Sequence, residues 1–190
     1  ILPSQNFNKW ELDFLTDYIV NTHHAYVLEA IELLDAYSVK VAKVHGENHP
    51  PVLEIERLYN MVKMELLQHM QKEERILFPY IKQMVNSKNE NCPLINSHFG
   101  TVQNPINMMQ AEHENAGDVL KEIANLSMNY TPPEWACNTF KALYAKLDEF
   151  EQDLHMHVHL ENNILFPKAI ELEKSFQVLK HHVHLEQQST

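Results

Sequence analysis

Two segments of this sequence repeat one pattern of residues that could bind metal ions. Residues 69–79 read His-Met-Gln-Lys-Glu-Glu-Arg-Ile-Leu-Phe-Pro, and residues 157–167 read His-Val-His-Leu-Glu-Asn-Asn-Ile-Leu-Phe-Pro. In both segments a glutamate follows a histidine by four residues. On an α-helix, residues four apart lie one turn above each other on the same face. Each segment therefore predicts an imidazole and a carboxylate that point the same way.

The shared Ile-Leu-Phe-Pro ending distinguishes these segments from chance pairs. The chain has 13 histidines, and a third His-x-x-x-Glu pair, His182 and Glu186, occurs near the C-terminus. The ending does not follow that third pair, so we interpret it as a coincidence of composition.

The spacing of the candidate ligands indicates an internal duplication. Two pairs, His69 with His157 and Glu73 with Glu161, are each separated by 88 residues, and His24 and His113 are separated by 89. The chain is therefore expected to form two helical hairpins, each giving one histidine from its first helix and a His-Glu pair from its second. Periodicity alone does not decide between His23 and His24, but the repeat spacing favours His24.

Four long helices would position these residues. The chain has three glycines, and its nine prolines fall in a few clusters, which favours uninterrupted helices over a sheet with many turns. Apolar periodicity and helix-capping residues predict helices over 9–45, 50–85, from 104 onward, and over 131–174. We expect an all-α, up-down-up-down four-helix bundle in residues 1–174, followed by a polar tail or short helix in residues 175–190.

The helix lengths place the candidate ligands at one level. In such a bundle, the start of the first helix lies beside the end of the second. His24 lies about 15 residues after its predicted helix start, which is roughly 22 Å at 1.5 Å per residue. His69 lies about 17 residues before the end of its helix, roughly 25 Å. The side chains are therefore expected to meet near the middle of the bundle.

Burial of the two glutamates is the strongest indication of a metal site. One histidine on an apolar stripe is more often a hydrogen-bonded core residue than a ligand. A glutamate, however, is almost never fully buried unless it is paired or bound to metal. Four imidazoles and two carboxylates suit iron, manganese or zinc, and not calcium. Six ligands suit two metal ions, with Glu73 and Glu161 able to bridge them, and a redox metal would leave positions for dioxygen, peroxide or nitric oxide.

Composition excludes several other functions. The net charge of −11 argues against nucleic acid or an anionic membrane surface as a partner. The sequence shows neither a membrane-spanning run nor a signal peptide.

Cys92 and Cys137 form no Cys-x-x-Cys motif and are expected far apart, so we predict an intracellular, reducing compartment and no disulfide. Glu65 and Glu112 lie near the predicted site and are expected to be solvated or at the edge of the core, with a role as outer partners of the ligands as the alternative. Surface positions, or positions beside the ligands, are expected for the remaining histidines: His45, His49, His98, His155, His159, His181, His182 and His184.

The sequence resembles the hemerythrin-like di-iron proteins and, within them, the repair-of-iron-centres family. The resemblance rests on residues 17–24, 43–46, 69–79, 105–117, 131–137 and 157–167. It implies a cytoplasmic protein with an oxo- or hydroxo-bridged di-iron centre, bridged also by both glutamates. The implied ligands are His24, His69, Glu73, His113, His157 and Glu161.

The resemblance also implies a role in restoring iron-sulfur clusters damaged by nitric oxide or peroxide. Iron donation to the damaged iron-sulfur proteins, and nitric oxide binding or reduction at the di-iron centre, are the implied activities. The alternative is a dioxygen-binding or sensing protein without turnover. Oxygen-carrying hemerythrins use five histidines, and the fifth has no obvious counterpart here. Many family members also carry an N-terminal domain with adjacent cysteines, a pattern that this sequence does not contain.

Overall fold

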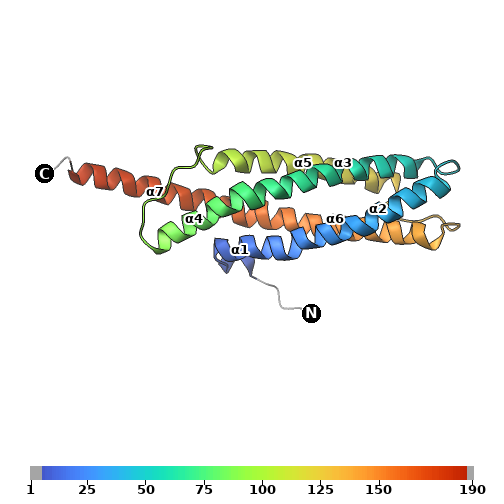
Figure 1. Cartoon of the computed structure of the whole chain (residues 1–190), viewed down its shortest axis with the longest axis horizontal. Helices are drawn as coiled ribbons and strands as arrows, with labels where there is room; N and C mark the ends of the chain where they lie inside the picture. The colour runs from blue at the N-terminus through green and yellow to red at the C-terminus, as the bar shows by residue number, and fades with distance from the viewer. Residues whose placement is uncertain (1–5, 188–190) are drawn as a thin grey trace.

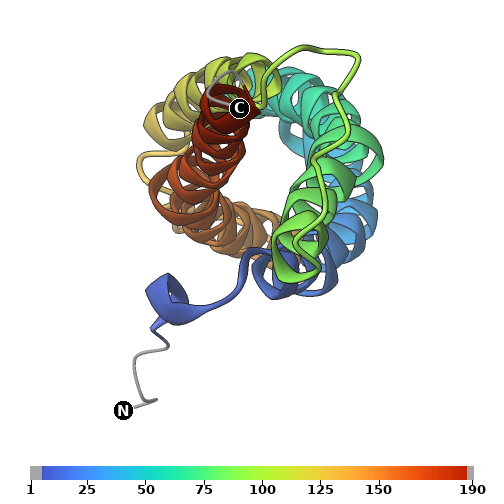
Figure 2. The ribbon, with the colours of Figure 1, turned by 90° about the vertical axis from the view of Figure 1, so that its left-hand side faces the viewer.

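The residues that the structure describes are mainly helical. The computed structural model describes residues 6–187, with side chains to residue 176. Four long helical segments lie side by side along the long axis of the molecule (Figure 1). Figure 2 looks along that axis and shows the helices surrounding a common centre. The all-α class predicted from the sequence is confirmed.

Three of the four long segments are interrupted by one π-helical turn. The first consists of α1 (Leu12–Tyr18), η2 (Ile19–His24) and α2 (Ala25–His45). The second consists of α3 (Pro51–Lys72), η3 (Glu73–Leu77) and α4 (Phe78–Asn89). The third is α5 (Gln103–Leu126), and the fourth consists of α6 (Asn138–Leu160), η4 (Glu161–Leu165) and α7 (Phe166–Gln187). A short 3₁₀ turn, η1 (Phe7–Lys9), precedes them.

The predicted start of the fourth helix was wrong. Thr131 was expected to cap it, but α6 begins at Asn138, and Cys137 before it has extended backbone angles of φ −70° and ψ 167°. Thr131 and Pro132 each precede a proline, which disfavours the helical conformation. At the other end the helix does not stop near residue 174 but continues to Gln187. The side chains of His181, His182, His184 and Glu186 lie outside the described residues.

Two apolar clusters make up the core and leave a polar layer between them. Helix α2 packs against α3 and α6, and α3 packs against α5. One cluster includes Leu66 and Leu154 from these helices, and the other includes Leu77 and Leu165. The candidate ligands on the same helices lie between these positions in the chain. The helices therefore surround the polar layer with hydrocarbon on both sides.

The isoleucines of the two repeated motifs do not both face the core. A π turn inserts one extra residue into the helix and shifts the face that follows it. Ile76 was expected on the buried stripe but is 38% exposed, whereas the next residue, Leu77, is 1% exposed. Ile164 of the second motif lies in the equivalent turn η4 and is 6% exposed, so the π turn alone does not determine which residue faces the core.

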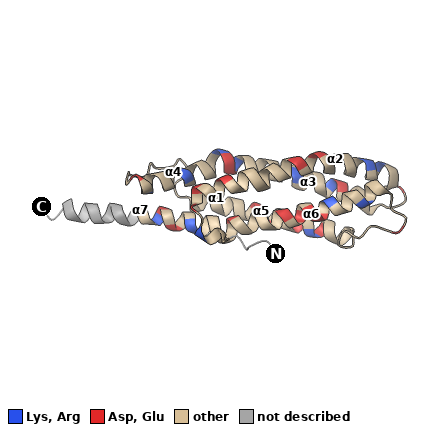
Figure 3. Cartoon of the chain, turned by 90° about the horizontal axis from the view of Figure 1, so that it is seen from below, with Lys and Arg blue, Asp and Glu red and all other residues tan. Residues whose placement is uncertain are grey.

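Charged side chains of both signs are distributed along the outer surface. Figure 3 shows acidic and basic residues interspersed on the face in view. Among the described residues, no helix has the length and apolar character needed to cross a membrane.

Gly46 and Gly117 provide a matched test of helix packing. Gly46 follows α2 with helical angles, and a Cβ atom there would lie 2.5 Å from the Ala42 carbonyl oxygen and 2.5 Å from a Leu53 methyl carbon. A Cβ atom at Gly117 in α5 would contact nothing within 4 Å. We expect Gly46→Ala to lower the free energy of unfolding by roughly 1–3 kcal/mol. Gly117→Ala should raise it by roughly 0.5–1 kcal/mol.

Urea denaturation of the two variants beside the wild type measures both effects. Equal stability of the Gly46→Ala variant and the wild type would contradict the close packing of the α2–α3 connection.

Candidate metal centre

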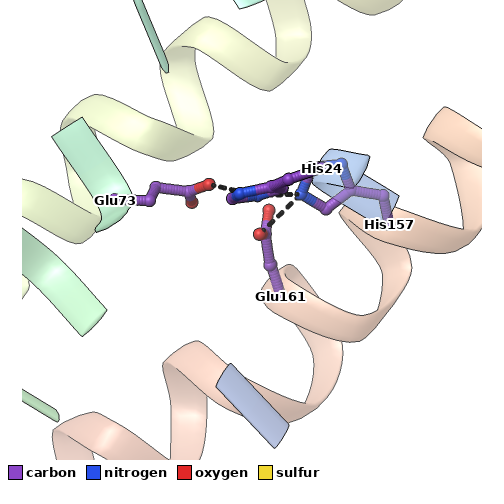
Figure 4. A group of neighbouring side chains, drawn as sticks. All are labelled: His24, Glu73, His157 and Glu161. Carbon is purple, nitrogen blue, oxygen red and sulfur yellow. Dashed lines mark hydrogen bonds and ion pairs between the residues drawn. The ribbon is translucent and has the colours of Figure 1, made fainter. Parts of the chain in front are cut away.

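The six predicted ligands converge in the polar layer between the two apolar clusters. Their side chains are buried, with both glutamates 0% exposed. Two groups have ligand atoms within 4.8 Å of one another: His24, Glu73, His157 and Glu161, and His69, Glu73, His113 and Glu161. Figure 4 shows the first group, with its four side chains directed toward one another. Each group thus contains two histidines, and both groups contain both glutamates.

Short distances join the atoms within each group. In the first group, His157 Nε2 lies 2.8 Å from Glu161 Oε1 and 3.3 Å from His24 Nε2. In the second group, His113 Nε2 lies 3.0 Å from His69 Nε2 and 3.0 Å from Glu161 Oε2. Glu73 Oε2 lies 3.3 Å from His24 Nε2 and 3.4 Å from His69 Nε2, so it faces both groups.

Outer hydrogen bonds fix the orientation of three imidazoles. The Nδ1 atoms of His24, His69 and His113 lie 2.7, 2.9 and 3.0 Å from Glu74 Oε1, Glu112 Oε2 and Asn162 Oδ1, respectively. Carboxylate and amide oxygens are acceptors, so Nδ1 carries the hydrogen in each ring. The Nε2 atoms of these three rings therefore face the centre, which is the orientation a metal ligand needs.

The centre requires positive charge. Both carboxylate oxygens of Glu73, and Oε2 of Glu161, are buried and accept no hydrogen bond. Imidazole Nε2 atoms face these oxygens, and two unprotonated atoms at about 3 Å would repel one another unless a proton or a metal ion lies between them. Protons on the imidazoles or metal ions can supply that charge. The imidazole and carboxylate donor set fits iron, manganese or zinc.

Opposite charge outweighs burial in setting the pKa values here. Burial alone would raise the pKa of the Glu161 carboxyl, but the imidazoles of His157 and His113 hold that pKa well below its usual range. Burial alone would lower the pKa of His69, but the Glu73 carboxylate raises it to about 9. At neutral pH the metal-free His69 imidazole is therefore protonated on both ring nitrogens. A metal ion that binds Nε2 must displace the proton on that atom.

The π-helical turns of the long segments each begin or end at a candidate ligand. His24 is the last residue of η2, Glu73 the first of η3 and Glu161 the first of η4. Such single π turns occur frequently at functional sites.

Each phenylalanine of the repeated motif stacks on a candidate ligand. The Phe78 ring stacks on His24 with centroids 5.9 Å apart and an interplanar angle of 17°. The Phe166 ring stacks on His113 at 6.1 Å and 4°. The motif thus supplies both a carboxylate and an apolar cover for an imidazole from another helix.

Sequence reasoning missed the outer partners of the ligands. Glu112 was expected to be solvated or at the edge of the core, but it accepts a hydrogen bond from His69 and also contacts Lys72. Glu74 and Asn162 were not singled out at all. All three are immediate chain neighbours of a ligand, and that adjacency is the signal that could have found them. Glu65 is exposed, as expected.

Comparison with known proteins identifies a family and several relatives. The family described as "Hemerythrin HHE cation binding domain" matches residues 16–169. The chain is 37% identical over 167 residues to the iron-sulfur cluster repair protein YtfE of Yersinia pseudotuberculosis serotype IB (strain PB1/+), covering 88% of this chain and 70% of that protein. Identity and coverage are the same for YtfE of Yersinia pestis (strain Pestoides F). Identity is 36% for YtfE of Yersinia pseudotuberculosis serotype O:1b (strain IP 31758).

Removing either buried carboxylate tests its predicted role as a shared ligand. We expect about two irons per chain in the wild type and a sharp fall in both Glu73→Ala and Glu161→Ala, because each glutamate belongs to both groups. Elemental analysis of protein reconstituted with ferrous iron measures this. Glu65→Ala, which removes an exposed glutamate of the same helix α3, is the control. Unchanged iron in either glutamate variant would contradict the bridging assignment.

Proposed function

This chain belongs to the hemerythrin HHE family, among the relatives of the iron-sulfur cluster repair protein YtfE, and on that premise we propose that it is a non-haem di-iron protein that repairs damaged iron-sulfur clusters. Iron donation to the damaged protein, and nitric oxide binding or reduction, are the activities we assign to its centre. The observation that carries the proposal is the pair of fully buried glutamates common to both four-residue groups.

Two metal ions explain this arrangement better than one. A single structural ion needs four protein ligands, whereas six converge here. With both carboxylates shared, each ion would have two histidines of its own: His24 and His157 for one, His69 and His113 for the other. Bound iron would supply a redox-active metal with coordination positions for small ligands such as nitric oxide or dioxygen.

The protein's residues orient the ligands and exclude water. Glu74, Glu112 and Asn162 hold three imidazoles with Nε2 inward, and the stacked phenylalanines cover two of them. The Glu74 and Glu112 side chains are 43% and 29% exposed, so they link the buried ligands His24 and His69 to the surface.

The same stacking contact supports the proposed duplication and up-and-down order. In each half, the motif phenylalanine of the second helix stacks on the candidate ligand of the first helix: Phe78 on His24 and Phe166 on His113. The histidines of the motifs, His69 and His157, then each meet the ligand of the opposite half. We propose that two equivalent hairpins in an up-down-up-down bundle build the centre together.

A cluster-repair assay tests the proposed function. A [4Fe–4S] protein damaged with nitric oxide is incubated with the iron-loaded chain, and cluster absorbance and activity are followed. We expect recovery with the wild type. The Glu161→Ala variant should give no more recovery than the equivalent amount of free ferrous iron, because it lacks a carboxylate of both groups. Equal recovery with wild type, variant and free iron would sink the repair role.

Rapid mixing separates the two reactions proposed for the centre. The diferrous protein is mixed with nitric oxide or with dioxygen in a stopped-flow instrument. Nitrous oxide formation with a single turnover of the centre is expected for a nitric oxide reductase activity. A stable, reversible dioxygen adduct without nitrous oxide would instead favour the dioxygen-binding alternative.

A further inference from the structure

The four candidate imidazole ligands do not have equivalent surroundings. Three of them donate from Nδ1 to a side-chain oxygen. His157 does not: it is 0% exposed, and its Nδ1 atom is buried without a hydrogen-bond partner. A metal-bound histidine almost always donates its second ring N–H to an acceptor, which fixes the ring and strengthens it as a ligand. An acceptor for His157 should therefore be sought among its neighbours.

His23 and Asp153 lie against this imidazole. The His23 ring stacks on the His157 ring, with centroids 5.6 Å apart and an interplanar angle of 13°. His23 is 4% exposed, and its Nδ1 atom donates to Asp153 Oδ1 at 2.9 Å. This contact joins η2 to α6. Because the π turn leaves both His23 and His24 buried, one helix places a ligand and a second imidazole side by side.

Asp153 has a free acceptor on the correct face of α6. It precedes His157 by four residues, so the two side chains lie one turn apart on the same face. Its Oδ1 atom is used by His23, and its Oδ2 atom is buried without a partner. A buried acceptor and a buried donor, each lacking a partner and one helical turn apart, both lose free energy unless they are joined.

We propose that Asp153 and His23 are positioning residues for His157, with Asp153 Oδ2 as the outer acceptor for His157 Nδ1–H through one bridging water. A water is required because the structure has no direct hydrogen bond between these two atoms. His23 holds the carboxylate in place through Oδ1 and packs flat on the ligand ring. The inference rests on the di-iron function proposed above and concerns only the ion that His24 and His157 would bind.

His23 itself does not belong to either set of ligand atoms. Its neighbour His24 does, together with His157 and both glutamates. The His23 Nδ1 atom is committed to Asp153, and its Nε2 atom is buried without a hydrogen-bond partner. The residue adjacent to a ligand therefore serves to orient a different ligand, one that lies 134 positions later in the chain.

Three substitutions separate the hydrogen bond from packing. Asp153→Ala removes the acceptor, Asp153→Asn keeps an uncharged acceptor, and His23→Phe keeps a flat ring but loses the bond to Asp153. His155→Gln, which alters an exposed histidine of the same helix, is the control. Each variant is reconstituted with ferrous iron. The Mössbauer spectrum and the rate of iron transfer to a ferrous chelator are recorded, with the melting temperature as a check on folding.

We expect one of the two irons to change. In Asp153→Ala one iron per chain should transfer to the chelator about 10- to 100-fold faster, and one Mössbauer doublet should shift, because outer partners of a metal-bound histidine typically affect metal affinity by that factor. Asp153→Asn and His23→Phe should give smaller effects on the same iron. His155→Gln should match the wild type.

Two results would overturn the inference. One is wild-type spectra and release rates in all three variants. The other is equal acceleration of both irons together with a lowered melting temperature, which a merely structural role predicts. If Asp153→Ala fails to fold, Asp153→Asn and His23→Phe decide the question. A wild type that does not bind two irons would instead refute the proposed di-iron function, a failure distinguishable from that of the positioning role.

Discussion

The structure depends on keeping two carboxylates buried between two apolar clusters. A charged carboxylate without a partner in such surroundings is among the least favourable groups in a folded protein. Here neither Glu73 nor Glu161 is exposed, and the imidazoles around them are themselves held by outer acceptors. The long helices, the π turns and the stacked phenylalanines all serve to bring these groups to one place. The positive charge that these carboxylates require is therefore as important to the fold as to the chemistry of the site.

The fold class and the convergence of the six predicted ligands followed from periodicity and spacing. The His-x-x-x-Glu pairs repeat at one interval, and burial of glutamate is costly enough to make the pattern informative. The start of α6 was harder, because Thr131 and the two prolines match a helix start as well as they match the extended segment found. Long-range partners such as Asp153 and His23 were beyond reach, since their meeting depends on how α6 packs against η2.

The two repeated motifs differ in how well a regular helical period describes them close to the centre. Each turn lies at a ligand, and each adds a residue that no apolar pattern marks. The isoleucine of the motif shows this difference: Ile76 is 38% exposed, while the corresponding Ile164, in an equivalent π turn, is 6% exposed. Local geometry at the site thus differs between halves that share the same sequence motif, and only the packed structure distinguishes them.

Each group of ligand atoms draws one histidine and one glutamate from either half of the chain. An ion bound in either group would tie the N-terminal hairpin to the C-terminal one, much as a disulfide ties distant segments, but through a bond that reduction, protonation or a competing chelator can open. The amount of bound metal would then determine how strongly the two hairpins are held together. Binding of iron would strengthen the contact between α2 and α6 and the contact between α3 and α5, and loss of iron would weaken them.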